Sequence, residues 1–214
     1  MSDSSSSTAV DFWFDPVCPW TWLTFRWMLE VRKARPVVIN LHVMSLAVLN
    51  EQRLDELPPR IRELMHQAWA PVRVLTAAQR EVGPHVLEPL YTALGTRYHL
   101  NQQPVARVAI EEALKDVGLS AELADAGESH AYDADVRASH SAGITLVGSE
   151  VGSPIIAVPG PEDGAGRVAF FGPVVTPTPK GADAVRLWDG ALAVATTPGF
   201  YEIKRGRNVG PIFD

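Results

Sequence analysis

A short turn that holds the chain's only cysteine joins a strand-like segment to a long apolar segment. The residues from 15 to 22 are Asp-Pro-Val-Cys-Pro-Trp-Thr-Trp. Alternating apolar and aromatic residues over 9–14 predict a strand, and residues 19–34 are typical of a helix. Proline is tolerated at the first helical position, so Pro19 marks the helix start and Cys18 becomes its N-cap. The chain must therefore hold its one thiol at a strand-to-helix turn.

Cys18 is predicted to be a reactive nucleophile. Unpaired N–H groups and the positive end of the helix dipole favour an anion there, which lowers the pKa of a thiol. A buried structural cysteine is the commoner fate of a free thiol. The fixed position beside Pro19 favours the reactive interpretation. One cysteine cannot form an internal disulfide, which fits a reducing compartment.

The pattern of the remaining chain changes twice. Residues 37–44 predict a second strand, parallel to the first because a helix connects them. A helical block follows, and strand character returns after Gly152, with a hairpin around a Gly- and Pro-rich loop. The expected later elements are a strand over 154–158, a loop over 159–166, a strand over 167–171 and a helix over 183–195. We therefore expect an α/β domain made of residues 9–50 and 144–214, an all-α insertion over 51–143, and a disordered leader over 1–8.

Two apolar faces and three glycines organise the helical block. The glycines are expected to be C-terminal caps of helices; they are Gly83, Gly118 and Gly143. The apolar faces recur at helical spacing and are predicted to be core. They are Ile61, Leu64, Met65, Ala68 and Trp69, and Leu87, Leu90, Tyr91, Leu94 and Tyr98.

Composition excludes several classes of function. The net charge of −6 argues against a nucleic-acid partner held by phosphate contacts. No apolar run approaches the ~18 residues that span a bilayer, and the polar start lacks the features of a signal peptide, so a cytoplasmic protein without a membrane partner is expected. The six histidines lack the spacing of a metal site, and no phosphate-binding glycine motif occurs. Neither a metal nor a nucleotide cofactor is expected.

Six separate segments carry a resemblance to a known family. Cys18-Pro19-Trp20-Thr21 resembles the CxxC site of thioredoxin-like proteins, with the fourth position changed. The chain as a whole, from about residue 9 to 214, resembles the actinobacterial DsbA-like proteins called mycothiol-dependent nitroreductases. The matching segments are 11–20, 42–46, 87–91, 151–154, 170–174 and 187–189.

The resemblance implies a thioredoxin-like fold with an inserted helical subdomain, as in DsbA. It implies a cytoplasmic thiol–disulfide oxidoreductase of a type that is often dimeric. Its reducing thiol would be mycothiol, and its substrates would be oxidised or electrophilic small molecules, nitro compounds included. Ser153-Pro154 resembles the cis-proline pair of the fold, in which the residue before the proline offers backbone groups to the substrate. Pro19 would position the helix, and Trp20 would stack on the substrate.

The chain departs from the family at one position, since Thr21 stands where the second cysteine of CPWC would be. Thiol–disulfide exchange passes through a mixed disulfide that a second thiol must resolve. This chain has no other cysteine, so we expect a monothiol cycle in which an external thiol frees Cys18. The Thr21 hydroxyl either donates to the thiolate or only marks the loss of the second cysteine. Asp15 is expected to cap the turn rather than to accept a proton.

Two other functions stay open at this point. Kappa-class glutathione transferases and hydroxychromene carboxylate isomerases use a hydroxyl residue at the start of the motif to activate a bound thiol. Cys18 occupies that position here, which weighs against them. A binding protein that kept the fold and lost the redox cycle is the third hypothesis. Survival of activity in Cys18→Ser would favour a transferase or isomerase, and an unreactive Cys18 would favour a binding protein.

Overall fold

A computed structural model describes residues 7–160 and 166–214 of the chain. Residues 1–6 of the expected leader and residues 161–165 of the expected loop lie outside the described part. The first strand begins at Thr8, where the Thr8 N–H donates to the Pro36 carbonyl oxygen at 2.7 Å. Thr8 therefore belongs to the sheet and not to the leader.

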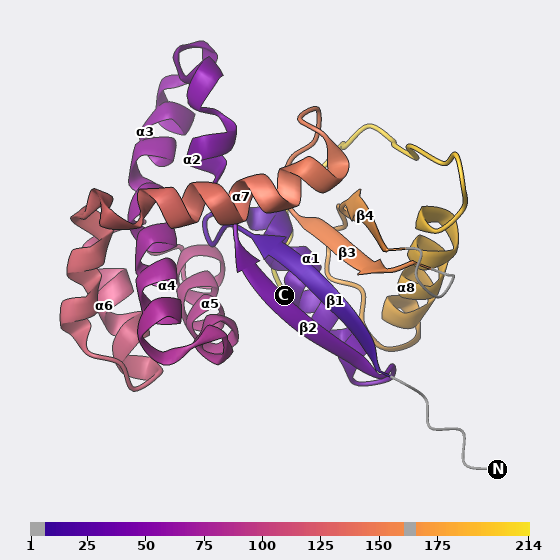
Figure 1. The fold of residues 1–214 in the computed structure, drawn as a ribbon, viewed down its shortest axis with the longest axis horizontal. Coiled ribbons are helices and arrows are strands. Elements are labelled where there is room, and N and C mark those ends of the chain that lie inside the picture. Colours follow the sequence, from indigo (N-terminus) through magenta and orange to yellow (C-terminus); the bar gives the residue numbers. More distant parts are fainter. Residues whose placement is uncertain (1–6, 161–165) are drawn as a thin grey trace.

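Within the described residues, four strands form one mixed sheet in the order β2-β1-β3-β4 (Figure 1). The central strand β1 pairs in parallel with β2, as the intervening helix predicts, and antiparallel with β3, which itself pairs antiparallel with β4. Residue Asp11 of β1 lies opposite Asn40 of β2 and Ala157 of β3. The strands are β1 (Thr8–Phe14), β2 (Val37–Val43), β3 (Ile155–Pro159) and β4 (Arg167–Phe171).

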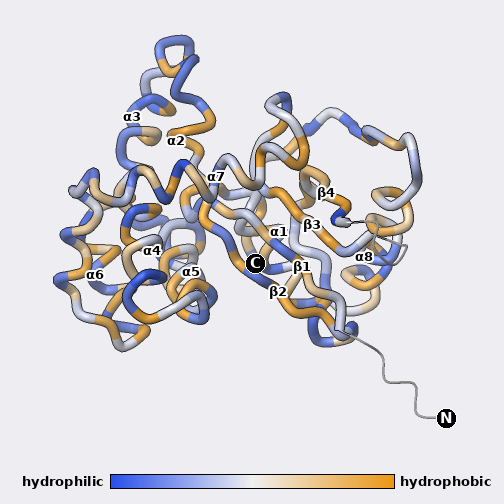
Figure 2. Tube along the Cα trace, viewed as in Figure 1, coloured by the Kyte–Doolittle hydropathy of each residue, from blue (hydrophilic) through white to orange (hydrophobic). Residues whose placement is uncertain are grey.

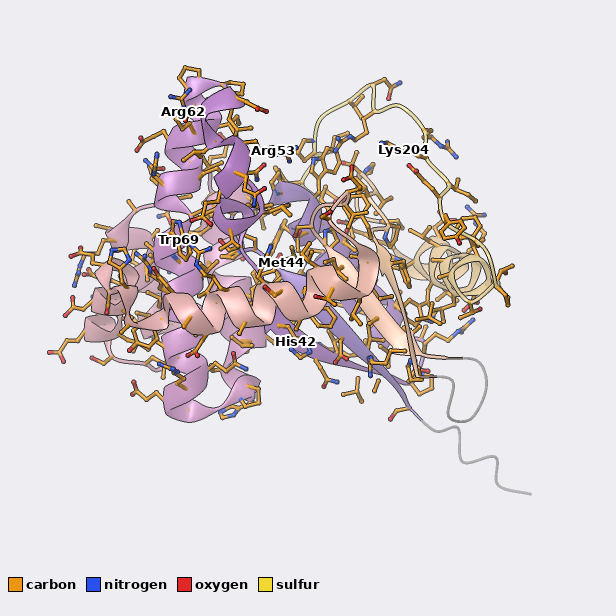
Figure 3. The ribbon with its side chains drawn as sticks, turned by 45° about the horizontal axis from the view of Figure 1, so that its top comes forward. His42, Met44, Arg53, Arg62, Trp69 and Lys204 are labelled. Carbon is orange, nitrogen blue, oxygen red and sulfur yellow. The ribbon has the colours of Figure 1, made fainter. Side chains whose placement is uncertain are left out.

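Helices cover both faces of the sheet. On one face α1 (Pro19–Arg32) packs beside α8 (Gly181–Ala195), where the Trp27 indole N–H donates to the Ala184 carbonyl at 2.9 Å. On the other face α7 (Asp133–Val147) crosses the strands, and the Trp13 indole N–H donates to its Ser139 carbonyl at 3.0 Å. Figure 3 labels Met44 beside α7, where it joins Trp13 in a small apolar cluster. Both faces of the central strands are therefore buried.

The helical block lies between β2 and β3 in the chain and to one side of the sheet (Figure 1). Figure 2 shows hydrophilic residues gathered at the outer end of α3, and hydrophobic residues where the strands meet the helices. The apolar face from Leu87 to Tyr98 is buried as predicted, whereas Ile61 on the other predicted face is exposed. The helices of the block are α2 (Leu46–Leu49), α3 (Pro59–Gln67), α4 (Trp69–Val82), α5 (Leu87–Gly95) and α6 (Arg107–Asp116). The 3-10 helices are η1 (Glu51–Glu56), η2 (Pro84–Val86), η4 (Ala121–Glu128) and η5 (His130–Tyr132), and η3 (Thr96–Leu100) is a π-helical turn.

One predicted helix cap is wrong. Gly143 lies inside α7, and the helix is capped five residues later by Gly148, at φ 89°. A β-carbon at Gly143 would come within 2.8 Å of the Trp13 ring, so glycine there allows α7 to approach the sheet. Because α7 continues across residue 143, the division of the chain at that residue remains a prediction. Gly83, at φ 97°, caps α4 as predicted.

Candidate active site

Asp15 organises the turn that carries the thiol. Its carboxylate accepts hydrogen bonds from the Val17 N–H at 2.8 Å and from the Leu46 N–H, at the start of α2, at 2.6 Å. Its backbone carbonyl accepts from the Cys18 N–H at 3.1 Å. The side chain is completely buried, and this burial raises its pKa to about 7 although the two N–H groups oppose the shift. Asp15 is therefore a cap of the turn, as expected, and it ties the turn to the helical block.

Cys18 is the N-cap of α1, and Pro19 occupies the first helical position. The backbone of Cys18 is extended, at φ −79° and ψ 112°, and its carbonyl accepts from the Trp22 N–H at 3.1 Å. As predicted, proline, which has no amide proton, begins the helix and the cysteine precedes it.

The thiol faces the loop before β3. Its sulfur donates a long hydrogen bond to the Ser153 carbonyl oxygen, at 3.9 Å, and the Ser153–Pro154 peptide bond is cis. The predicted isomer is therefore confirmed. Residues 135 positions apart in the chain meet because β1 and β3 are neighbours in the sheet.

Thr21 lies one helical turn after Cys18 and is fully buried. Its hydroxyl oxygen lies 2.5 Å from the Ser153 hydroxyl oxygen, in a hydrogen bond that either group could donate. A hydrogen bond from the Thr21 side chain also lowers the Cys18 pKa. The residue in place of a second cysteine thus links the thiol to the cis-proline loop.

The prediction that the helix start lowers the pKa of Cys18 is wrong in this structure. Burial raises the pKa of the thiol above its ordinary value, and the nearby Asp15 carboxylate raises it further. The hydrogen bonds from Thr21 and from the Trp20 N–H act in the opposite direction and are smaller. The helix-start rule failed here because it assumes a hydrated sulfur, whereas Cys18 is only 5% exposed.

His99 is a member of the site that the sequence did not identify. Its Nε2 lies 2.9 Å from the Pro16 carbonyl oxygen, and its ring packs at 5.7 Å from Trp22. Burial lowers its pKa to about 4, so the ring is neutral near pH 7 and Nε2–H donates to Pro16. No sequence motif marked His99, because it reaches the site through the packing of η3 against α1.

Two tyrosines that the sequence assigned to the core also lie at the site. The hydroxyl groups of Tyr91 and Tyr98 are buried and have no hydrogen-bond partner among the described residues. Burial raises the pKa values of both tyrosines. The charge of Cys18 raises the pKa of Tyr91 further, and the charge of Asp15 raises the pKa of Tyr98 further. The prediction that Tyr91 and Tyr98 belong to the core is therefore confirmed. The Cys18 site lies against the apolar face that contains them.

Trp20, the residue expected to stack on substrate, is half-buried and already has a partner within the chain. The guanidinium carbon of Arg207 lies 5.0 Å from the centre of its ring. Arg207 follows Lys204 and Arg205 in a short basic stretch of the chain. Among the described residues no group of acidic, histidine or cysteine side chains could hold a metal ion, and no helix could cross a membrane.

The residues at Cys18 suit a small thiol as co-substrate. Exchange requires one nucleophilic sulfur, and it is helped by a backbone carbonyl that can accept an N–H of the incoming thiol. Cys18 and the Ser153 carbonyl provide these two groups side by side. Ser153, which precedes the cis proline Pro154, contacts both Cys18 and Thr21. Pro19 and Trp20 lie between Cys18 and Thr21 in the chain.

Comparisons with known proteins agree with this geometry. A family described as "Rv2466c-like: Mycothiol-dependent nitroreductase Rv2466c" matches residues 17–205. The uncharacterized protein Rv2286c of Mycobacterium tuberculosis is 30% identical over 204 residues, which cover 94% of this chain and 83% of that protein.

Two solved structures share the fold. The probable DsbA oxidoreductase SCO1869 of Streptomyces coelicolor superimposes with a TM-score of 0.55 at 17% identity, covering 94% of each chain. The cytosolic disulfide reductase DsbM of Pseudomonas aeruginosa superimposes with a TM-score of 0.55 at 13% identity, and the match covers 86% of this chain and 98% of that chain. The expected DsbA-like thioredoxin fold is therefore confirmed, and the chain belongs to the Rv2466c-like family of mycothiol-dependent nitroreductases.

Proposed function

We propose that this protein is a thiol–disulfide oxidoreductase that works with Cys18 alone and takes its electrons from mycothiol. The observation that supports this most strongly is the meeting of the only thiol, at the start of α1, with the cis Ser153–Pro154 loop. Membership of a mycothiol-dependent family supports the choice of reducing thiol.

In the first step the Cys18 thiolate attacks a mixed disulfide between mycothiol and a second thiol. A bond forms between Cys18 and the mycothiol sulfur, the original disulfide bond breaks, and the second thiol leaves as a thiolate that takes a proton from solvent. The Thr21 hydroxyl stabilises the Cys18 thiolate before attack. The Ser153 carbonyl, 3.9 Å from the sulfur, accepts an N–H group of the bound partner.

In the second step Cys18 is released by an external thiol, because the chain has no second cysteine to displace it. The thiolate of another mycothiol molecule attacks the mycothiol sulfur of the adduct, and mycothiol disulfide leaves. The complete reaction consumes one mixed disulfide and one mycothiol and yields one free thiol and one mycothiol disulfide.

Electrophilic substrates fit the same cycle. When Cys18 and one mycothiol molecule join in a disulfide they release two electrons and two protons, enough to convert a nitro group into a nitroso group and water. A second mycothiol molecule then frees Cys18, as above. Family membership supports this class of substrate.

Turnover of a mycothiol mixed disulfide with a chromogenic thiol tests the proposal. The wild-type protein should release the chromophore with mycothiol in excess, and Cys18→Ser should release none above background. Thr21→Cys is the matched variant, since it creates a CPWC motif, and its oxidised form should lose two mass units as an internal disulfide forms. Full activity in Cys18→Ser would contradict the proposal and favour a transferase or isomerase.

A further inference from the structure

The segment after α8 contacts one side of the Cys18 turn directly and reaches the other side through His99. Arg207 lies over Trp20, two residues after Cys18. Phe213 stacks on His99, with ring centres 5.5 Å apart, and His99 holds the carbonyl of Pro16, two residues before Cys18. Six residues of extended chain reach at most about 20 Å, so residues 207–213 cross the turn in one short span.

Further contacts hold this span near its end. The Ile212 N–H donates to the Thr176 hydroxyl at 2.7 Å, and the Lys180 ammonium lies 2.7 Å from the Asp214 carboxylate. In Figure 1 the segment leaves α8 and arcs over the upper right of the view, and the C-terminus is marked near the centre.

Cys18 is closed to a disulfide substrate in this arrangement. Its exposed fraction is 5%, and exchange requires a substrate sulfur to contact the thiol directly. Two open hollows on the described part of the surface lie elsewhere. One borders Glu88, Arg97 and Asp116, and the other borders Pro177, Lys180 and Leu187.

The segment after α8 is held by weak contacts, and its first part is exposed to solvent. Residues 200–214 form no helix or strand, and a cation–π contact or ion pair between exposed groups contributes little. The first part extends into solvent, with Tyr201 95% and Ile203 77% exposed. Figure 3 shows Lys204 on this outer part, far from Arg62 on α3.

We infer that Arg207–Asp214 is a strap that closes the Cys18 site and lifts when a thiol or disulfide substrate binds. This inference rests on the proposed function, since it assigns regulation to the same thiol. The family match ends at residue 205, so the contacts of Arg207 and Phe213 lie outside it. Burial also raises the pKa of Cys18, so lifting the strap would hydrate the sulfur and favour the thiolate.

Alkylation of the full chain by a neutral reagent tests the strap, because Cys18 is the only thiol that can react. Arg207→Ala should raise the rate constant about two- to fivefold, the factor expected for one exposed cation–π contact. Phe213→Ala, and the double variant, should raise it further. Arg205→Ala removes the same charge two residues away and should leave the rate unchanged. Arg207→Ala changes only an exposed side chain, so it remains informative if Phe213→Ala fails to fold.

Equal alkylation rates in the wild type and in all three strap variants would overturn the inference. A parallel reaction with mycothiol disulfide separates it from the proposed function. Faster alkylation with no mycothiol adduct in any variant would support the strap and contradict the function. A reversible adduct with equal alkylation rates throughout would support the function and contradict the strap.

Discussion

At the Cys18 sulfur, burial and hydrogen bonding act in opposite directions. Loss of hydration favours the neutral thiol, whereas the Thr21 hydroxyl favours the thiolate. Asp15 adds a second buried acid whose charge opposes ionisation of the thiol. Thr21, which stands three residues after Cys18, thus places one polar group beside the sulfur, and removing this group should have measurable consequences.

Thr21→Val removes the hydroxyl and keeps the shape of the side chain. We expect the pKa of Cys18 to rise further and alkylation near pH 7.5 to slow, because the thiolate loses a donor. Stability should fall by about 1–3 kcal/mol, since the buried Ser153 hydroxyl loses its partner. Thr24→Val is the matched control, because Thr24 bonds the Pro173 carbonyl at 2.8 Å. It should reduce stability and leave the thiol pKa unchanged. An unchanged Cys18 pKa in Thr21→Val would show that Thr21 has no role at the sulfur.

Asp15→Asn tests the raised pKa of the buried carboxyl. The folded protein holds the Asp15 proton up to about pH 7, whereas the unfolded chain releases it near pH 4. Between these values the folded state binds more protons, so ionisation makes wild-type stability fall as pH rises through this range. Relative to Asp15→Asn, the wild type should lose up to roughly 4 kcal/mol between pH 4 and pH 8.

Urea unfolding of both proteins across this range measures that difference. Comparison with the variant cancels the opposite slope of His99, whose folded pKa of about 4 makes stability rise with pH between about 4 and 6.5. A pH-independent difference between the two proteins would show that folding does not raise the pKa of Asp15.

At the scale of elements, the site depends on how closely helices approach the sheet and one another. Gly143 brings α7 against the Trp13 ring, and Gly95 of α5 brings that helix against Trp22 in α1. Both contacts lie beside the strand and helix that meet at Cys18. Glycine therefore serves here as a spacer between elements.

Gly143→Ala and Gly190→Ala form a matched pair of substitutions inside helices. The first should destabilise the fold by about 1–3 kcal/mol, because its β-carbon would lie 2.8 Å from the Trp13 ring. The second lies in α8 with open space around it and should stabilise by about 0.5–1 kcal/mol through helix propensity. Thermal unfolding of the two variants measures both changes in stability. Equal changes of the same sign in the two variants would contradict the close packing of α7 against Trp13.

Local rules predicted the elements well and the site less completely. Proline at a helix start and alternating apolar residues gave β1, α1 and β2 to within two residues, and the family motif gave the cis-proline loop. His99 and Phe213 had no local signal, since they reach the turn only through tertiary packing. The predicted direction of the Cys18 pKa shift was also wrong because of tertiary packing, since distant segments bury the sulfur.

At the scale of the whole molecule, the fold gathers distant parts of the chain around one sulfur. The sheet order sets β3 beside β1, which brings Ser153 to Cys18. The helical block contributes Leu46 and His99 to the turn, and the segment after α8 contributes Arg207. A site assembled from four regions can be opened by moving one of them, and the segment after α8 has the least regular structure.

The mass of the intact protein after exposure to mycothiol disulfide tests the central claim most directly. The account predicts a single mycothiol adduct on Cys18 that free mycothiol removes, and no adduct on Cys18→Ser. The rate of adduct formation should rise with pH, because the thiolate is the attacking species. An unmodified wild-type protein under conditions in which a model thiol reacts fully would contradict a monothiol mechanism at Cys18.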